Sequence, residues 1–340
     1  MKKTILALTI PALFATSASA VEIYSAEDGS KVDLYGRIQY EAGAVAYQTA
    51  KPNKAENFGG DGEARLGINV KYTLDDATDL IGKYEAQLDA ESKSNGNEVN
   101  TRYAWLGFRF MDTTDLTFGK SEAPRAQLTD LTDTFDIFGG KVAKATSFNR
   151  VDDQVRLSYA ENGLDLRAAY AFNDKRKQDD NVFDGSSANG NRWGTSAGYT
   201  APIGLGFVAN YNQENNNGVA LGLTDKTSEW GIGAHYTVEG FYFAGLYGER
   251  DINYVATTDG GNSFWELQAA YNVQEWTLIA NYANQKGRNA DSGSADQKVD
   301  EYTFAVRYGF TPKTKVYAEY VVNEVKDKDD LYGVGIQYNF

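Results

Sequence analysis

The chain has 340 residues, a formal net charge of −14 and no cysteine. The acidic balance argues against a nucleic-acid partner, because phosphate recognition needs a basic surface, and a chain without cysteine contains no disulfides. Aromatic residues are frequent, with 23 tyrosines, 17 phenylalanines and 5 tryptophans beside 34 glycines and only 5 prolines. Such a composition is typical of many long β-strands with an aromatic belt.

The first twenty residues have the pattern of a secretory signal peptide. A short basic region, Lys2 and Lys3, precedes an apolar core over residues 4–14, and Ala18-Ser19-Ala20 supplies the small residues of a cleavage site. The segment is too short, and the residues after it are too polar, for an N-terminal membrane helix. We therefore predict a signal peptide over 1–20, cleaved near Ala20, and a single mature domain over 21–340.

The mature chain contains no apolar run approaching the ~20 residues of a spanning helix, and its mean hydropathy is −0.50. A low average is compatible with a transmembrane barrel, whose strands alternate lipid-facing and water-facing residues. Alternation is the period that recurs here. Apolar Leu66, Ile68 and Val70, for example, are separated by single residues that are polar or glycine.

About sixteen segments carry this strand signature. They cover 31–47, 63–74, 80–91, 99–110, 114–120, 152–161, 163–173, 191–200, 203–213, 227–238, 240–250, 262–273, 275–286, 299–311, 313–324 and 331–340. Tight connectors alternate with long polar ones. The long ones are 48–62, 92–98, 121–151, 174–190, 214–226, 251–261, 287–298 and 325–330. Tight turns at one rim and long loops at the other are typical of an outer-membrane barrel.

The strand number predicts an all-β fold, a 16-stranded antiparallel transmembrane β-barrel, because about sixteen strands leave an aqueous channel inside. Parity places charged residues such as Lys83, Glu85 and Arg307 on the face that lines this lumen. The alternative is a soluble barrel with the apolar face as its core. The strand number argues against it, because a barrel whose interior is filled with side chains has about eight strands.

Two segments add detail. Segment 99–110 carries apolar residues on both faces, which predicts a bulge or a strand buried on both sides at a subunit contact. The final segment alternates up to Phe340, the last residue. Since nothing polar follows, we expect it to close the barrel by pairing with the first strand.

At these residues the chain resembles the general porin family of Gram-negative bacteria, over its whole mature length. The most specific matches are VEIY (21–24), KVDLYG (31–36), ARLG (64–67), Phe138-Gly139-Gly140 and the terminal YNF (338–340). The resemblance implies a homotrimer of sixteen-stranded barrels and a third loop that folds into each lumen. Segment 121–151 is the longest connector, which suits an in-folded third loop independently of the family. Gly139 and Gly140 permit the backbone angles that such a turn requires.

In such porins a half-ring of basic wall residues faces acidic groups on the inward loop. The basic positions of this constriction carry over to Arg37, Arg65, Arg102 and Arg150. Strand parity supports the first three on the lumen face, with Arg102 expected opposite to Tyr103 and Trp105. Arg150 stands at a junction of loop and strand, where parity is no guide.

The acidic side departs from the family pattern. Asp133 matches the family's loop aspartate. The family's Pro-Glu-Phe-Gly-Gly is represented here by Asp136, Ile137, Phe138, Gly139 and Gly140. Ile137 therefore occupies the position of the usual glutamate, and Asp136 stands one residue earlier. Either Asp136 supplies the missing charge, or the constriction has one acidic charge fewer. Facing rows of opposite charge set up a transverse field in a narrow, water-filled gap.

The predicted function is a general diffusion porin of the outer membrane, passing ions and small hydrophilic solutes. A solute-specific outer-membrane channel is the alternative, and it would show an aromatic ladder along the pore. An enzyme would need a nucleophile and a base or a metal site, but His235 is the only histidine and is expected on a lumen face. No cofactor, metal or catalytic residue is predicted. Outer-membrane lipid and lipopolysaccharide are the expected partners. The charged loop clusters at 174–180 and 326–330 are interpreted as solvated loop charges, with bridging of lipopolysaccharide through divalent cations as the alternative.

Overall fold

The computed structural model describes residues 20–44, 58–89, 99–140, 142, 150–172, 190–215, 224–255, 259–288, 299–326 and 328–340. The predicted signal peptide, apart from Ala20, lies outside the described residues. So do most residues of the predicted long loops, including the charged cluster at 174–180. Within the described ranges, no helix has the length and apolar character needed to cross a membrane.

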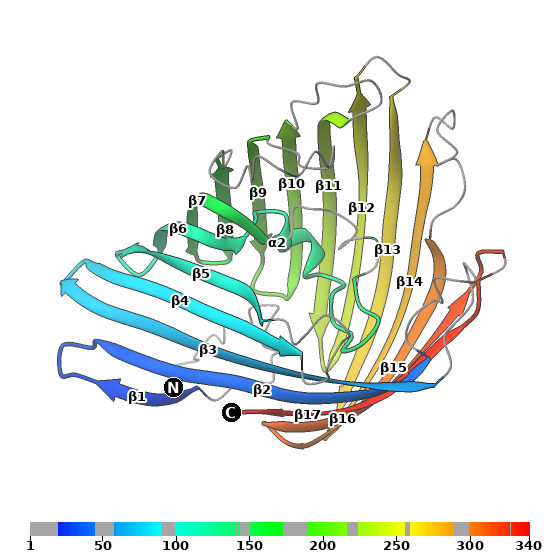
Figure 1. Ribbon diagram of the computed structural model, residues 1–340, viewed down its shortest axis with the longest axis horizontal. Helices are drawn as coiled ribbons and strands as arrows, with labels where there is room; N and C mark the ends of the chain where they lie inside the picture. Colours follow the sequence, from blue (N-terminus) through cyan, green and yellow to red (C-terminus); the bar gives the residue numbers. More distant parts are fainter. Residues whose placement is uncertain are drawn as a thin grey trace, which may run out of the picture.

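Antiparallel strands and one short helix make up the described chain (Figure 1). The elements are β1 (Val21–Ser25), β2 (Lys31–Ala44), β3 (Gly59–Asp75), β4 (Thr78–Asp89), β5 (Val99–Phe110), β6 (Thr114–Glu122), α2 (Ala126–Thr129), β7 (Arg150–Glu161), β8 (Leu164–Ala171), β9 (Arg192–Thr200), β10 (Leu205–Asn215), β11 (Thr224–Val238), β12 (Phe241–Tyr254), β13 (Gly260–Val273), β14 (Trp276–Arg288), β15 (Val299–Thr311), β16 (Thr314–Asn323) and β17 (Leu331–Asn339).

The sheet closes on itself into a barrel (Figure 1). Strands β2 to β17 pair in sequence order, each antiparallel to the next, and β17 pairs with β2. Beyond the last paired residues, Phe340 N donates to Gly36 O and Gly36 N donates to Phe340 O, both at 3.0 Å. The predicted barrel of 16 strands and the predicted closing role of the C-terminal strand are confirmed.

The sequence does not predict β1. This strand pairs with the first residues of β2, with Val21 opposite Leu34 and Ser25 opposite Lys31. It therefore lies beside β2 in line with β17, and extends the seam of the barrel. The register of β1 shifts between Glu22 and Tyr24, so a search for strict alternation misses it.

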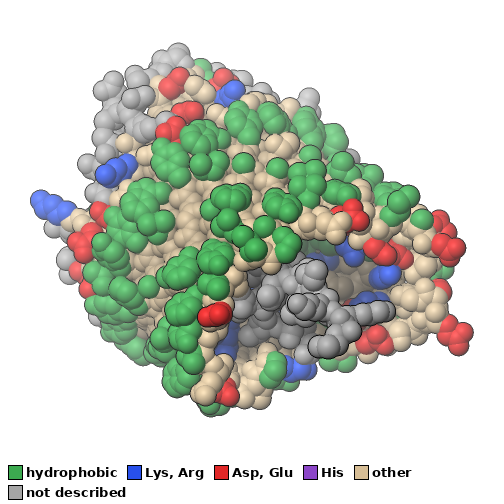
Figure 2. Space-filling view, turned by 180° about the vertical axis from the view of Figure 1, so that it is seen from behind, with side chains coloured by type: hydrophobic (Ala, Val, Ile, Leu, Met, Phe, Trp, Pro, Cys, Tyr) green, Lys and Arg blue, Asp and Glu red, His purple; other side chains and the backbone are tan. Residues whose placement is uncertain are grey.

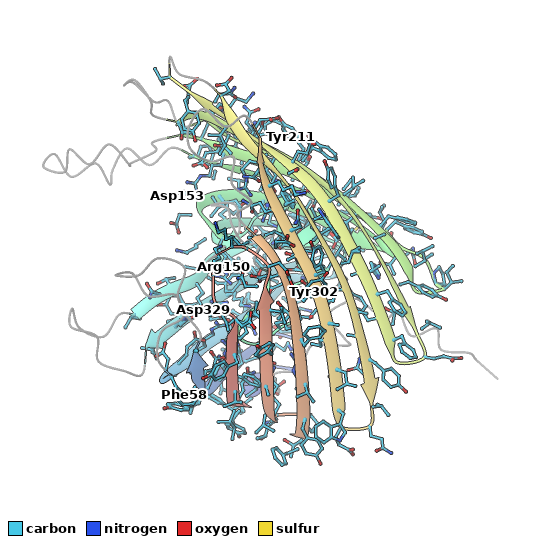
Figure 3. The ribbon with its side chains drawn as sticks, turned by 90° about the vertical axis from the view of Figure 1, so that its right-hand side faces the viewer. Phe58, Arg150, Asp153, Tyr211, Tyr302 and Asp329 are labelled. Atoms are coloured by element: carbon cyan, nitrogen blue, oxygen red, sulfur yellow. The ribbon has the colours of Figure 1, made fainter. Side chains whose placement is uncertain are left out.

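Side chains are arranged inside out relative to a soluble protein. Ile38 is 60% exposed whereas its neighbour Gln39 is 7% exposed, and Leu267 is 55% exposed between the buried Glu266 and Gln268. Figure 2 shows hydrophobic side chains spread over the outer wall, and Figure 3 shows side chains on both faces of the long strands β10 to β17. An apolar outer wall of this extent requires lipid around it. The alternative of a soluble barrel with an apolar core is therefore excluded.

The tight connectors at 162–163 and 239–240 are two-residue hairpin turns. Asn162 and Gly163 have φ of 50° and 85°, and Glu239 and Gly240 have φ of 46° and 85°. Two successive positive φ angles define the type I′ turn, whose twist matches that of the flanking strands. These turns lie at the rim opposite to the long connectors, as predicted from connector length.

The ambiguous segment 99–110 is β5, and it contains a bulge at Arg102. Glu85 of β4 pairs with Tyr103, and the next residue of β4 pairs with Thr101, so Arg102 has no partner across this strand pair. The extra residue resets the alternation. Arg102 and Tyr103 consequently lie on the same lumen face, and the expectation that Arg102 lies opposite to Tyr103 and Trp105 is wrong.

Candidate functional site

The connector between β6 and β7 leaves the wall and enters the barrel (Figure 1). We call it the inward loop; residues 123–140 and 142 of it are described. It begins near α2, and Leu128 and Leu131 are fully buried in an apolar cluster with wall residues that include Val208 and Tyr242. Tyr242 Oη donates to Leu131 O at 2.8 Å. The third long connector thus folds inward, as the sequence predicts.

A buried charge cluster fixes the root of the inward loop. Arg125, just before α2, forms an ion pair with Glu229 of β11, and both side chains are 0% exposed. Arg250 of β12 donates to the same carboxylate through Nε at 3.0 Å and Nη2 at 2.7 Å. One carboxylate shared by two guanidinium groups compensates for much of the desolvation of the charges. The cluster therefore ties the loop to β11 and β12.

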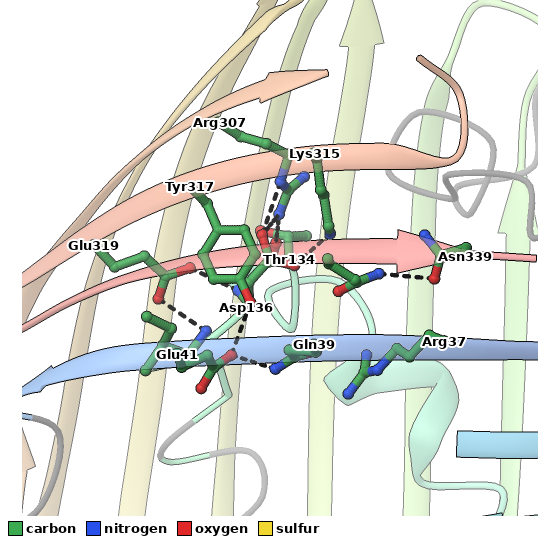
Figure 4. Close-up of polar contacts among 12 residues, drawn as sticks. Arg37, Gln39, Glu41, Thr134, Asp136, Arg307, Lys315, Tyr317, Glu319 and Asn339 are labelled. Atoms are coloured by element: carbon green, nitrogen blue, oxygen red, sulfur yellow. Dashed lines mark hydrogen bonds and ion pairs between the residues drawn. The ribbon is translucent and has the colours of Figure 1, made fainter. Parts of the chain in front are cut away.

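The tip of the inward loop is held at the other side of the barrel by Glu319 of β16 (Figure 4). Its carboxylate accepts three successive backbone N–H groups, from Asp136 at 2.6 Å, Ile137 at 3.1 Å and Phe138 at 2.8 Å. Successive N–H groups that converge on one anion form a strong, directional anchor. The loop therefore crosses the lumen and is attached to the wall at both ends.

The carboxylate of Asp136 points towards the wall. It forms an ion pair with Arg307 at 2.7 Å and another with Lys315, and its side chain is 9% exposed. Burial disfavours the charged carboxylate, but the positive charges of Lys315 and Arg307 outweigh this and hold the pKa of Asp136 below its ordinary value. Arg307 Nη2 also donates to the backbone oxygen of Thr134 at 2.9 Å. Asp136 thus acts as a second anchor of the tip.

Apolar contacts and glycines complete the tip. Phe138 is buried against Val321 and the start of β17, and Ile137 packs against the same cluster. Gly140 has φ of 65°, where a side chain would be strained. The Phe-Gly-Gly motif is therefore explained by a turn and by packing on the wall.

Asp133 lies between the root and the tip of the inward loop, and its side chain is half-buried. A Cβ atom at Gly139 would come within 2.9 Å of Asp133 Oδ1, so the chain folds back closely on itself here. The predicted loop aspartate is therefore partly exposed, whereas the Asp136 side chain is 9% exposed.

Three of the four predicted arginines share one hydrogen-bond network. Arg37 and Arg65 are paired across β2 and β3, and their Nη2 atoms contact the same Glu63 oxygen at 2.5 and 2.9 Å. Arg65 Nε donates to Gln87 Oε1 at 3.1 Å, and Arg102 Nη1 donates to that oxygen at 3.0 Å. The guanidinium groups thus form a continuous row across β2, β3 and β5.

The row continues through acidic and aromatic side chains. Arg102 Nε donates to Glu85 at 2.5 Å, and the other Glu85 oxygen accepts a hydrogen bond from Tyr35 Oη at 2.8 Å. The guanidinium carbon of Arg150, at the start of β7, lies 5.5 Å from the ring centre of Tyr103, within cation–π range. Arg150 therefore lies beside this part of the row, and no hydrogen bond among the described residues joins it to the other three arginines.

The sequence predicts the arginines but not the groups that neutralise them. Glu63 and Glu85 lie within the row of cations, and Lys83 Nζ lies 5.3 and 4.3 Å from the ring centres of Tyr35 and Tyr103. The sequence does hold a signal for part of this arrangement, since Lys83 and Glu85 are two residues apart and therefore share a strand face. It does not indicate that this face lies beside the arginines, because that depends on contacts between strands that are distant in sequence.

These features together define a class of protein. A closed antiparallel barrel with a lipid-facing apolar wall, a polar lumen and a loop across that lumen is the architecture of a porin. The family model described as Gram-negative porin matches residues 7–330. The chain belongs to the Gram-negative porin family: it is an outer-membrane protein whose pore allows passive diffusion of ions and small hydrophilic solutes.

Individual relatives agree over the full length. The chain is 27% identical to "Outer membrane porin F" of Xenorhabdus nematophila and 29% identical to "Porin-like protein L" of Photobacterium profundum, with 100% of both chains covered in each case. Its fold is similar to that of Salmonella typhi OmpF in complex with daunomycin, with a TM-score of 0.75, 19% identity and coverage of 94% and 100%. An anion-selective porin from Comamonas acidovorans gives a TM-score of 0.71 at 15% identity, with coverage of 92% and 100%.

Proposed function

We propose that passage is controlled where the inward loop faces the arginine row, and that the mature chain, without residues 1–20, works as a homotrimer in contact with outer-membrane lipid and lipopolysaccharide. The basic side of this constriction is formed by Arg37, Arg65, Arg102 and Arg150. Asp133 is its acidic group on the loop. The observation that carries the proposal is the attachment of the loop to opposite walls, which keeps it across the lumen.

The inward loop presents fewer acidic charges to the constriction than the family pattern does. Ile137 replaces the usual glutamate, and the Asp136 carboxylate is already neutralised by Arg307 and Lys315. The arginine row in turn contains carboxylates of its own, so its net positive charge is small. A pore of this kind discriminates weakly between cations and anions.

Two tyrosines beside the arginine row favour general diffusion over solute-specific transport. Tyr35 and Tyr103 face the lumen, but Lys83 lies over both rings, and their hydroxyl groups donate to Glu85 and Glu122. A ring covered by a cation and tied at its hydroxyl group is a poor stacking surface for a passing solute. The tyrosines therefore support the charged row.

Conductance in a planar bilayer tests the proposal. Purified protein should insert in events of three equal, ohmic steps, one for each pore of a trimer, and liposomes that contain it should swell in small sugars faster than in large ones. Absence of conductance would exclude the pore, and single steps would exclude the trimer.

Replacement of Glu63 by glutamine should shift ion selectivity towards anions. The carboxylate neutralises both Arg37 and Arg65, so its loss adds one positive charge to the basic side. The reversal potential in a KCl gradient should move towards that of chloride, and Asp133→Asn should move it in the same direction. Glu161→Gln is the matched control, because it removes the same charge from an exposed site beside a tight turn. An unchanged reversal potential in Glu63→Gln would contradict the proposal that the arginine row forms the basic side of the constriction.

A further inference from the structure

One arginine of the lumen has no partner in the described part of the chain. Arg156 lies in the middle of β7, between Thr117 of β6 and Ala169 of β8. Its outward-facing neighbour Leu157 is 49% exposed, so alternation directs Arg156 into the lumen. Its Nε atom is buried and lacks a hydrogen-bond partner, and no described carboxylate forms an ion pair with it. A buried, unsatisfied charged donor is costly unless water or an ion binds it.

Other arginines of the lumen have a partner that the protein itself supplies. Arg192 of β9, for instance, contacts Glu214 through Nε at 2.8 Å and Nη2 at 2.7 Å. Arg150 has the ring of Tyr103 against it. Among the described residues, Arg156 therefore differs from these two in having neither an ion-pair partner nor an aromatic ring against its guanidinium group.

A second guanidinium group lies close by. Arg167 of β8 pairs with Ser158, two residues from Arg156 along β7, and diagonal neighbours on one sheet face are roughly 7–8 Å apart. Their charges repel each other. Arg167 binds Asp165 through Nε at 3.0 Å and Nη2 at 2.6 Å, which leaves its Nη1 group for another acceptor.

We propose that Arg156 and Arg167 form an anion-binding subsite for small oxyanions that carry a phosphate group. Two planar guanidinium groups can each present a pair of N–H donors to the oxygens of one phosphate, and its charge would offset their repulsion. The proposal rests on the pore proposed above, because the anion must reach the site through the lumen.

The position of the subsite gives it a role in transit. β7 runs from Arg150, beside the arginine row, to the tight turn at Asn162, so Arg156 lies between the constriction and the rim of tight turns. That rim faces the periplasm in barrels of this kind. A weak site there holds an anion that has passed the constriction and releases it inward, since conduction requires binding that is easily reversed.

Inorganic phosphate is the probe. The chloride-carried current of the purified trimer in a planar bilayer should fall saturably as potassium phosphate is added at pH 7, constant KCl and constant ionic strength. Arg156→Gln should raise the half-inhibiting phosphate concentration about tenfold, as expected for loss of a charge-assisted pair of hydrogen bonds. Arg156→Lys, which keeps the charge but not the fork of donors, should give an intermediate value.

Arg192→Gln is the matched control, because it removes the same charge from a lumen guanidinium group that already has a carboxylate partner. It should leave the half-inhibiting concentration within about twofold of the parent value. Normal conductance in KCl with no saturable phosphate effect in the parent protein would overturn the subsite and leave the pore intact. Equal effects in Arg156→Gln and Arg192→Gln would also overturn it, as they would reflect net charge alone. No conductance in KCl would instead contradict the pore itself.

Discussion

Replacement of Glu229 by alanine is expected to lower the free energy of unfolding by about 3–5 kcal/mol, because it leaves two guanidinium groups without their shared carboxylate. Arg125 and Glu229 have fully buried side chains, and that of Arg250 is 8% exposed, so water cannot replace the lost partner without local opening. Urea titration of the refolded protein, followed by the fraction that keeps the mobility of the folded barrel in an unheated gel, measures the loss.

Two controls distinguish the cost of leaving buried charges unpaired from the cost of losing an ion pair as such. Glu214→Ala removes the partner of Arg192, which is 28% exposed and can be solvated, so its cost should be at most about 1 kcal/mol. Replacing Arg125, Glu229 and Arg250 together by apolar residues of similar size should recover most of the stability, because no buried charge then remains unpaired. If Glu229→Ala were no more harmful than Glu214→Ala, the cluster would not be the anchor of the loop root.

The wall of the barrel could be predicted because its physics is local. Each strand needs one face for lipid and one for water, so the contrast between Ile38 and Gln39 is visible in the sequence itself. The closing strand could be predicted for the same reason, since alternation continues to Phe340. The short β1 could not, because its register shift breaks the period that identifies a strand.

The candidate site could be predicted only in part because its partners are distant in sequence. Glu229 follows Arg125 by 104 residues, and Glu319 follows the loop tip by more than 180. Nothing near Asp136 in sequence indicates that its carboxylate would be taken up by Arg307 and Lys315. Parity also fails at Arg102, where one extra residue in β5 reverses the alternation.

Replacement of Glu319 by alanine should release the tip of the inward loop. The change orphans three successive N–H groups, each worth about 1–3 kcal/mol if it stays unsatisfied, so the tip is expected to leave the wall and find water in the lumen. Asp136 would still hold Arg307 and Lys315, but the backbone between Asp136 and Phe138 would be free to move. The energetic cost to the whole barrel should therefore be smaller than that of Glu229→Ala, because the released N–H groups can be hydrated once the tip leaves the wall, whereas the guanidinium groups at the root of the loop stay buried.

The effect should be clearest in the current. A tip that leaves the wall can enter the open part of the lumen, so single-channel records of Glu319→Ala should show greater open-state noise and closure at lower voltage than the parent protein. Glu319→Gln, which keeps one carbonyl acceptor, should lie between the two. Gln337→Ala is the matched wall control, since Gln337 is a buried lumen residue of β17 that donates to Asn339. Records of Glu319→Ala as quiet as those of Gln337→Ala would mean that Asp136 and the apolar contact of Phe138 hold the tip without the carboxylate.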